Sequence, residues 1–241
     1  MLKIKGLSKS YGSGKIKAVD NIEFEVKPGE IFGFLGPNGA GKTTTIKMIV
    51  GLLRPDQGEV YINGINNQTN PMDAKRQFSY VPDNHEVFEK LKGIEYLNFM
   101  GDVYGVEKDK RKEEIEKYLK LFEMEKAVND PISSYSHGMK QKIVLIGSLL
   151  HDPMVFILDE PMVGLDPKSS YNLKELMKQR CAEGKSVFFS THVLEVAEKL
   201  CDRIAIINKG KIIAQGTMEQ LKGDAKDKES LEKIFLELTE L

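Results

Sequence analysis

A glycine-rich run followed by a lysine and two threonines is the segment of this sequence best suited to phosphate chemistry. The run is Gly36, Pro37, Asn38, Gly39, Ala40, Gly41, Lys42, Thr43 and Thr44, and it fits the pattern G-x-x-x-x-G-K-[ST]. Glycines let successive backbone N–H groups turn toward a phosphate and replace its tightly held water. We expect Lys42 to reach the terminal phosphates and act in catalysis, and the Thr43 hydroxyl to hold Mg²⁺. The run therefore predicts a site for ATP and Mg²⁺.

Two adjacent acids follow a short apolar segment much later in the chain. The segment Val155–Leu158 reads as a buried strand and ends in Asp159 and Glu160. At the carboxyl end of a parallel strand, Asp159 could orient Mg²⁺ and Glu160 could polarise the water that attacks the γ-phosphate. Such a pair is a weak signal alone, because acids often follow strands. Together with the phosphate loop it predicts a hydrolytic site.

His192 follows another apolar strand, in the sequence Ser-Thr-His. Strand ends on this side of an open α/β sheet face the ligand crevice. A histidine there could hydrogen-bond the γ-phosphate and hold the catalytic water and the carboxylate in place. We therefore predict a catalytic role for His192, although a lone histidine is more often structural.

Short apolar strands alternating with helices would position these residues. The run Ile31–Leu35 is apolar throughout, as expected of a strand buried on both faces, and leads into the phosphate loop. We predict further strands at 155–158, 186–190 and 203–207 with helices at 173–182 and 193–200. A hairpin should follow at 208–211. This alternation predicts a parallel sheet covered by helices.

The other segments have different periodicities. Ile22, Phe24 and Val26 alternate with polar residues, which indicates antiparallel strands with one wet face near the amino terminus. The range 84–150 reads as helical, with one helix over 110–122, a break at 131–136 and a second helix beginning near His137. In the tail, Leu231, Ile234, Phe235, Leu238 and Leu241 form one helical face that would pack on its own domain or dock a partner.

Composition excludes several classes of protein. The 241 residues carry 35 basic and 36 acidic side chains, a balance that does not favour a nucleic-acid partner. No apolar run is long enough to cross a bilayer, and the lysine-rich amino terminus is no signal peptide. Cys181 and Cys201 lack metal-ligand spacing and indicate reduced thiols of a cytosolic protein. Any role at a membrane must come through a partner chain.

Taken together, these motifs resemble the nucleotide-binding domain of ABC ATPases across nearly the whole chain. The stretch from Tyr135 to Gln141 occupies the place of the family signature, usually Leu-Ser-Gly-Gly-Gln. Ser136 and Gly138 match it, whereas a tyrosine, a histidine and a methionine replace its other positions. The resemblance implies that Ser136 and Gly138 meet ATP bound to the opposite subunit. Locally, Ser136 reads as a helix N-cap, and a helix N-terminus can meet an anion.

Three further positions acquire roles from the resemblance. Tyr11 would stack on adenine. The stretch from Pro161 to Asp166 would be the D-loop that crosses a dimer interface, with Asp166 near the nucleotide. Asp83 stands where many members have the Q-loop glutamine and could bind Mg²⁺ or water. Asp83 and the tail also resemble ATPases that pair with ABC-2-type membrane proteins, most of them exporters.

The resemblance implies an α/β fold with a P-loop NTPase (RecA-like) core. A parallel sheet flanked by helices would be joined by an N-terminal antiparallel β subdomain and an inserted helical subdomain. We expect a single domain over 1–241. Its core and β subdomain would occupy 1–83 and 151–220, its helical subdomain 84–150 and its C-terminal helix 221–241.

The expected protein is the ATP-hydrolysing subunit of a transporter, working as a head-to-tail dimer. A homodimer is expected, with an integral membrane permease as partner, at the cytoplasmic face of the cell membrane. Two alternatives stay open: a soluble ABC-type ATPase, and a hydrolysis-impaired ATP-binding partner in a heterodimer.

Overall fold

The strand that precedes the phosphate loop lies inside a six-stranded sheet. The computed structural model describes residues 1–12, 14, 16–84, 88–222 and 231–239. The sheet has the order β10-β9-β3-β8-β7-β6, and all its strands are parallel except β10. Its strands are β3 (Ile31–Leu35), β6 (Phe78–Val81), β7 (Val155–Asp159), β8 (Ser186–Thr191), β9 (Arg203–Asn208) and β10 (Lys211–Thr217). Strands β3, β7 and β8 are buried along their whole length, as their apolar sequences predict.

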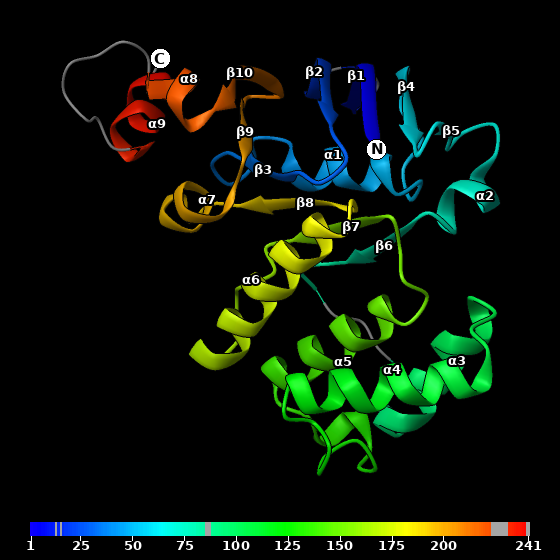
Figure 1. Cartoon of the computed structure of the whole chain (residues 1–241). Coiled ribbons are helices and arrows are strands. Elements are labelled where there is room, and N and C mark those ends of the chain that lie inside the picture. The colour runs from blue at the N-terminus through cyan, green and yellow to red at the C-terminus, as the bar shows by residue number, and fades with distance from the viewer. Residues whose placement is uncertain (13, 15, 85–87, 223–230, 240–241) are drawn as a thin grey trace.

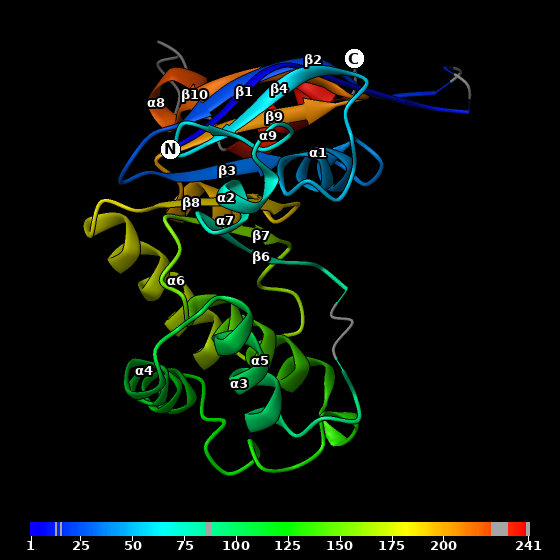
Figure 2. The ribbon, with the colours of Figure 1, turned by 90° about the vertical axis from the view of Figure 1, so that its right-hand side faces the viewer.

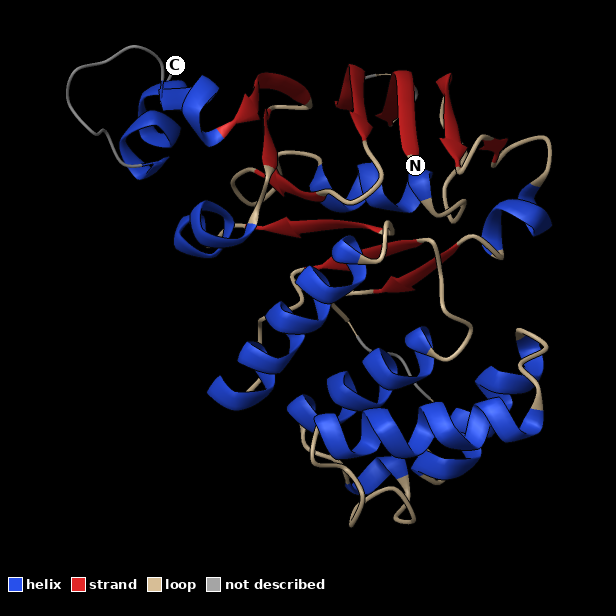
Figure 3. Cartoon of the chain, viewed as in Figure 1, coloured by secondary structure: helices blue, strands red, loops and turns tan. Residues whose placement is uncertain are grey.

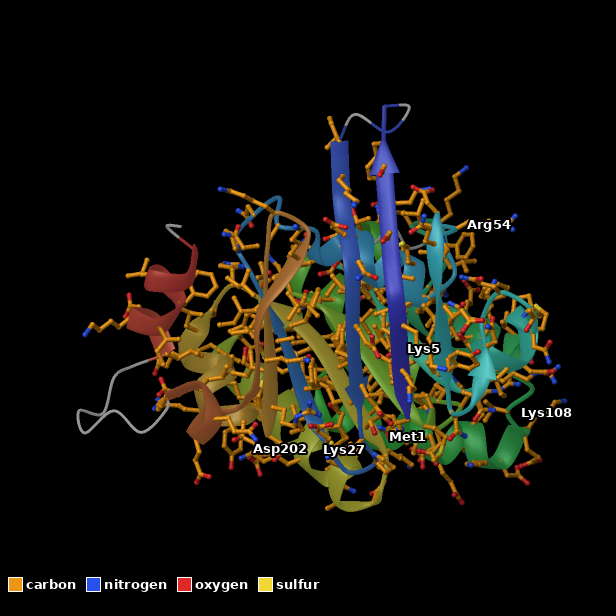
Figure 4. The ribbon with its side chains drawn as sticks, turned by 90° about the horizontal axis from the view of Figure 1, so that it is seen from above. Met1, Lys5, Lys27, Arg54, Lys108 and Asp202 are labelled. Carbon is orange, nitrogen blue, oxygen red and sulfur yellow. The ribbon has the colours of Figure 1, made fainter. Side chains whose placement is uncertain are left out.

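A second, antiparallel sheet covers one side of the molecule and has the order β2-β1-β4-β5. Figure 4 looks down on it and shows β1 and β2 side by side, with the C-terminal helices beyond β9 and β10. Its strands are β1 (Leu2–Tyr11), β2 (Ile16–Val26), β4 (Gln57–Ile62) and β5 (Ile65–Asn66). In β2 the buried Ile22, Phe24 and Val26 alternate with exposed residues, which confirms the predicted wet face.

Aromatic packing joins the two sheets. The Phe24 ring lies 5.3 Å from Phe32 and 5.5 Å from both Phe34 and Phe188, centroid to centroid. Helix α1 (Lys42–Ile49) packs in the same core and begins directly after Gly41 of the phosphate loop. The rear of the phosphate loop therefore rests on a rigid core.

Helices α3 (Gly93–Val103), α4 (Lys108–Leu121) and α5 (His137–Leu149) form a layer on the opposite side of the six-stranded sheet (Figures 1 and 2). The turn η1 (Ile132–Ser134) precedes α5. On the helix predicted over 110–122, Ile115, Leu119 and Phe122 are buried in a core that also contains residues of β7 and β8. Helix α5, which begins within the predicted signature, is thereby packed against the six-stranded sheet.

The remaining helices complete the covering of the sheets (Figure 3). They are α2 (Pro71–Lys75), α6 (Pro167–Ala182), α7 (Leu194–Leu200), α8 (Met218–Lys222) and α9 (Leu231–Thr239). Leu231 of α9 is buried in a cluster with residues of α7 and β9, and Phe235 packs against the same cluster. Ile234 is also buried, so this face packs on its own chain. Leu241 and the side chain of Leu238 lie outside the described residues.

Within the described residues, no helix combines the length and the apolar character needed to span a bilayer. Cys181 and Cys201 are both free thiols, and burial raises the pKa of each.

Candidate active site

The phosphate loop connects β3 to α1 under tight packing. A Cβ on Gly36 would lie 2.3 Å from the Ile207 carbonyl oxygen, and one on Gly41 would lie 2.5 Å from that of Ala18. Gly41 also has φ = 112° at the N-cap of α1, a conformation that residues with a side chain rarely adopt. Both glycines are therefore required for the loop to pass between β2 and β9.

The ammonium of Lys42 lies across the loop that carries it. Its Nζ donates to the carbonyl oxygens of Gly36 at 2.7 Å and Pro37 at 3.3 Å, and the residue is buried. Glu160 Oε1 lies 3.8 Å from the same nitrogen. The Lys42 ammonium is thus held over the loop as a buried cation beside Glu160, which follows β7.

Asp159 ends β7 and is almost fully buried. The Ser190 hydroxyl donates to its Oδ1, and the Thr43 side chain lies close to the carboxylate. Burial raises the pKa of Asp159, and the charges of Asp83 and Glu160 raise it further. Its Oδ2 is buried and has no hydrogen-bond partner among the described residues. A cation would satisfy this oxygen and lower the cost of the buried charge.

Glu160 and His192 are in direct contact. Glu160 Oε1 lies 3.0 Å from His192 Nδ1, and the His192 backbone N–H donates to Oε2 over 3.4 Å. The Glu160 backbone N–H donates to the Ser190 carbonyl and hydroxyl oxygens at 3.3 Å and 3.1 Å. Glu160 has φ = 49°, which costs about 1–3 kcal/mol in a residue other than glycine. This conformation orients the carboxylate toward Lys42 and His192.

A cavity of about 220 Å³ opens in front of these groups. It is lined by Ala18, Pro37, Asn38, Gly39, Gly41, Lys42, Thr43, Thr44, Asp83, Asp159 and Glu160. Asp83 thus lies at the same cavity as the two acids of β7. Among the described residues, no group of three or more His, Cys, Asp or Glu side chains is arranged to hold a metal. Mg²⁺ does not require such a cage, since it binds through one or two carboxylates and substrate phosphates.

Besides Gly36, Ala40 and His192, four sequence-predicted residues are not part of this cavity's described lining. Tyr11 is 43% exposed and lies at the end of β1. Ser136 is the N-cap of α5, as predicted, and accepts from the Met139 N–H. Gly138 packs against the backbone of Gly164.

Asp166, the fourth, is the N-cap of α6. Its carboxylate accepts from the Ser169 N–H at 2.9 Å and hydroxyl at 2.7 Å, and Lys142 Nζ lies 2.7 Å away. The Lys142 ammonium and the Ser169 donors hold the pKa of Asp166 well below its usual range. In this chain the side chain serves as a charged anchor between α5 and α6.

The sequence reasoning did not assign a role to Ser190. Its hydroxyl donates to Asp159 and accepts from the Glu160 N–H, so it ties both acids to β8. A buried hydroxyl at the end of an apolar strand, next to the histidine, was the available signal. Ala18 was also missed, because β2 reaches the loop only through tertiary packing.

A family model described as "ABC transporter" matches residues 19–163, which include the phosphate loop, the signature and both acids. The chain belongs to the ABC transporter ATP-binding family. The fold prediction is therefore confirmed, as is the prediction of an ATP-hydrolysing transporter subunit.

Several relatives cover most of this ABC ATPase. The "ABC-type transporter ATP-binding protein EcsA" of Bacillus subtilis is 35% identical over 99% of this chain and 96% of its own. The "linearmycin resistance ATP-binding protein LnrL" of the same organism is 41% identical over 92% of this chain and 70% of its own.

Two solved structures have the same fold. An "ATP binding subunit of ABC transporter" superposes with a TM-score of 0.94 at 33% identity, over 99% of both chains. The cassette MJ0796, solved as a dimer in a post-hydrolysis state with ADP and Pi, has a TM-score of 0.82 at 26% identity. It covers 91% of this chain and 99% of its own.

Proposed function

We propose that two copies of this ABC ATPase close head to tail on two ATP molecules, hydrolyse them and reopen, and that this cycle drives export by a membrane permease. The dimeric form of MJ0796 supports the assembly. The names of three relatives support export: they refer to linearmycin resistance, Nod factor export and doxorubicin resistance. The proposed place of work is the cytoplasmic face of the cell membrane.

In the proposed reaction, Glu160 polarises the water that attacks the γ-phosphate. His192, at 3.0 Å, holds the carboxylate and the water in line. Lys42 stabilises the charge that develops on the transferring group. Backbone N–H groups of the loop, which runs over 36–44, cradle the phosphates.

Thr43, Asp159 and Asp83 are the residues that we propose to hold Mg²⁺. The unpartnered Oδ2 of Asp159 and its contact with Thr43 support this donor set, since hydroxyl and carboxylate oxygens suit a hard cation. When bound, the ion would neutralise charge on the β- and γ-phosphates. The negative charge of Asp83 would make the site attract a cation more strongly than a neutral side chain at that position would.

Residues outside the cavity would act on the ATP of the partner copy. We propose that Ser136 and Gly138 present the N-terminus of α5 to the γ-phosphate of that nucleotide. Asp166 would reach the interface beside it, and Tyr11 would stack on adenine bound to its own loop. The exposure of Tyr11 is compatible with a stacking surface.

An exposed aromatic pair supports a docking surface for an ABC-2-like permease. Phe88 and Phe99 are 59% and 43% exposed, and their rings pack edge to face at 5.6 Å. Val103 on the same helix as Phe99 is also exposed. We propose that this surface contacts the permease.

We also propose that the chain divides into a core over 1–83 and 151–220, a helical subdomain over 84–150 and a C-terminal helix over 221–241.

The contact of Glu160 with both His192 and Lys42 is the observation that carries the proposed function. Glu160→Gln should lower steady-state ATP turnover by about 10²–10³-fold, because general-base catalysis contributes this much. Affinity for a fluorescent ATP analogue should be retained. Glu195→Gln, at an exposed glutamate of α7, is the matched control and should hydrolyse ATP normally. Normal turnover in Glu160→Gln would refute the assignment.

A further inference from the structure

The signature helix is attached to the segment that follows the catalytic carboxylate of the same chain. Gln141, on the second turn of α5, is 1% exposed. Its Nε2 donates to the carbonyl oxygen of Pro161 at 2.6 Å, in a buried contact. Pro161 comes directly after Glu160. One hydrogen bond therefore links the signature helix to Pro161, the residue that follows the proposed base Glu160.

The orientation of the Gln141 amide follows from its partners. Pro161 O can only accept, so the amide nitrogen must face it. The Gln141 Oε1 is buried and has no hydrogen-bond partner among the described residues. Turning the amide over would bring two acceptors together and leave both unsatisfied. The amide therefore makes this one hydrogen bond, although leaving its buried oxygen without a partner costs free energy.

The backbone conformation of Glu160 is held by hydrogen bonds of the chain on both its amino and its carboxyl side. On its amino side, its N–H is bound by Ser190 of β8. On its carboxyl side, Pro161 has no N–H to offer, so the carbonyl oxygen is the backbone polar group available for anchoring. With φ = 49° at Glu160, the backbone is held in a conformation that surrounding contacts must maintain.

We propose that Gln141 is a positioning residue for hydrolysis, which holds Pro161 so that the Glu160 carboxylate keeps its place between Lys42 and His192. Close packing of the first turn of α5 on the same segment supports this role. A Cβ on Gly138 would lie 2.6 Å from the Gly164 carbonyl oxygen, and one on Gly164 would lie 2.5 Å from His137 Cδ2. The helix and the segment are therefore in close contact, without room for one to shift freely past the other.

This link has a consequence for a dimer. It rests on the proposed function, in which the N-terminus of α5 meets the ATP of the partner copy and Glu160 acts on ATP in its own chain. A shift of α5 on meeting that nucleotide would be carried through Gln141 to Glu160. Hydrolysis at one site would then depend on occupancy of the other.

The test is Gln141→Met, which keeps length and volume but removes the donor. Turnover should fall at least tenfold, because misplacement of a catalytic group by about 1 Å can cost 10²-fold. The KM for ATP should stay within twofold. Combined with Glu160→Gln, the change should lower the residual single-turnover rate by less than twofold, since the group it positions has already been lost. Ser148→Ala, which removes another buried side-chain hydrogen bond of α5, is the matched control and should leave turnover unchanged.

Each other outcome would count against the inference. Turnover of Gln141→Met within twofold of the unaltered protein would overturn it, with the proposed function intact if Glu160→Gln remains inactive. An equal loss in the Glu160→Gln background would reduce Gln141 to a general structural role. Normal turnover of Glu160→Gln would overturn the proposed base itself. If Gln141→Met does not fold, Gln141→Asn, whose amide is one methylene too short to reach Pro161, must show the same pattern.

Discussion

At the scale of single residues, the buried carboxylate of Asp159 has an unfavourable environment. Burial raises its pKa, and its Oδ2 has no hydrogen-bond partner among the described residues. The folded protein therefore binds a proton at Asp159 more tightly than the unfolded chain does. As pH rises through the raised pKa, this carboxylate lowers the free energy of unfolding. The proposed role of Asp159 in holding Mg²⁺ would explain why such a charge is kept.

Replacing that charge should stabilise the protein without nucleotide. In EDTA at pH 7, Asp159→Asn should raise the unfolding temperature by about 2–4 °C, the shift that 1 kcal/mol produces in a chain of this size. The gain should shrink as pH falls, because Asp159 itself becomes neutral. ATP turnover with Mg²⁺ should be lost. Differential scanning fluorimetry against the exposed Asp73→Asn checks this, and a lower unfolding temperature at pH 7 would contradict it.

Residue types were enough to propose most of the catalytic groups, but not to predict which contacts hold them. Lys42, Asp159 and Glu160 could be found because the chemistry of phosphates restricts their choice and spacing. Ser190 could not be assigned from its type, because its hydroxyl reaches Asp159 and Glu160 only when β7 and β8 are adjacent. Tyr11 was predicted by resemblance alone, and the described lining of the cavity does not include it.

At the scale of elements, His151 joins the helical layer to the six-stranded sheet. Its ring stacks on Tyr104, with centroids 3.7 Å apart, and its Nε2 lies 3.2 Å from the Phe78 carbonyl oxygen of β6. Since that oxygen can only accept, Nε2 carries the proton of the neutral ring. Burial lowers the pKa of His151 to about 4. Its neutral form is therefore part of this junction.

The junction should be sensitive to acid. The unfolded chain takes up a proton at His151 below its ordinary pKa of 6.5, while the folded chain does so only near 4. The protein should lose about 3 kcal/mol of unfolding free energy through this group between pH 7 and pH 4. His151→Phe keeps the stacking but cannot take up a proton. Its unfolding free energy should therefore fall by about 3 kcal/mol less than that of the unaltered protein between pH 7 and pH 4. Urea denaturation at several pH values measures the difference, and equal pH dependence in both proteins would contradict it.

The C-terminal helix α9 should stabilise the chain through one face only. Leu231 is fully buried and packs in a cluster with Leu35, Ala197 and Ile204, whereas Leu236 is 47% exposed. Leu231→Ala should cost about 2–4 kcal/mol of unfolding free energy, and Leu236→Ala less than about 0.5 kcal/mol. Urea denaturation of the two variants compares these faces. Equal effects would mean that α9 does not pack as described.

Apolar runs predicted the strands better than they predicted short elements. The all-apolar β3 and the alternating β2 both correspond to their observed burial. Helix α2 has five residues and only Ala74 buried, so no periodicity could indicate it. The position of β3 between β8 and β9 also has no local signal, since it depends on parallel pairing between distant segments.

At the scale of the whole molecule, one chain carries the parts of two half-sites in separate places. The phosphate loop, both acids and Asp83 line one cavity, whereas Ser136 and Gly138 lie at the start of α5 and outside its described lining. A site that uses both sets would need a second ATPase subunit, which we propose is a copy of this chain. The balanced net charge of -1 gives no strong repulsion between copies.

Size-exclusion chromatography of Glu160→Gln, with and without Mg²⁺-ATP, tests this account most directly. With hydrolysis blocked, the closed dimer should accumulate, so the variant should elute as a monomer alone and as a dimer with Mg²⁺-ATP. Lys42→Ala in the same background should prevent the shift by removing the phosphate contact. A monomer at all nucleotide concentrations, in a variant that still binds ATP, would contradict a site shared between two copies of this chain.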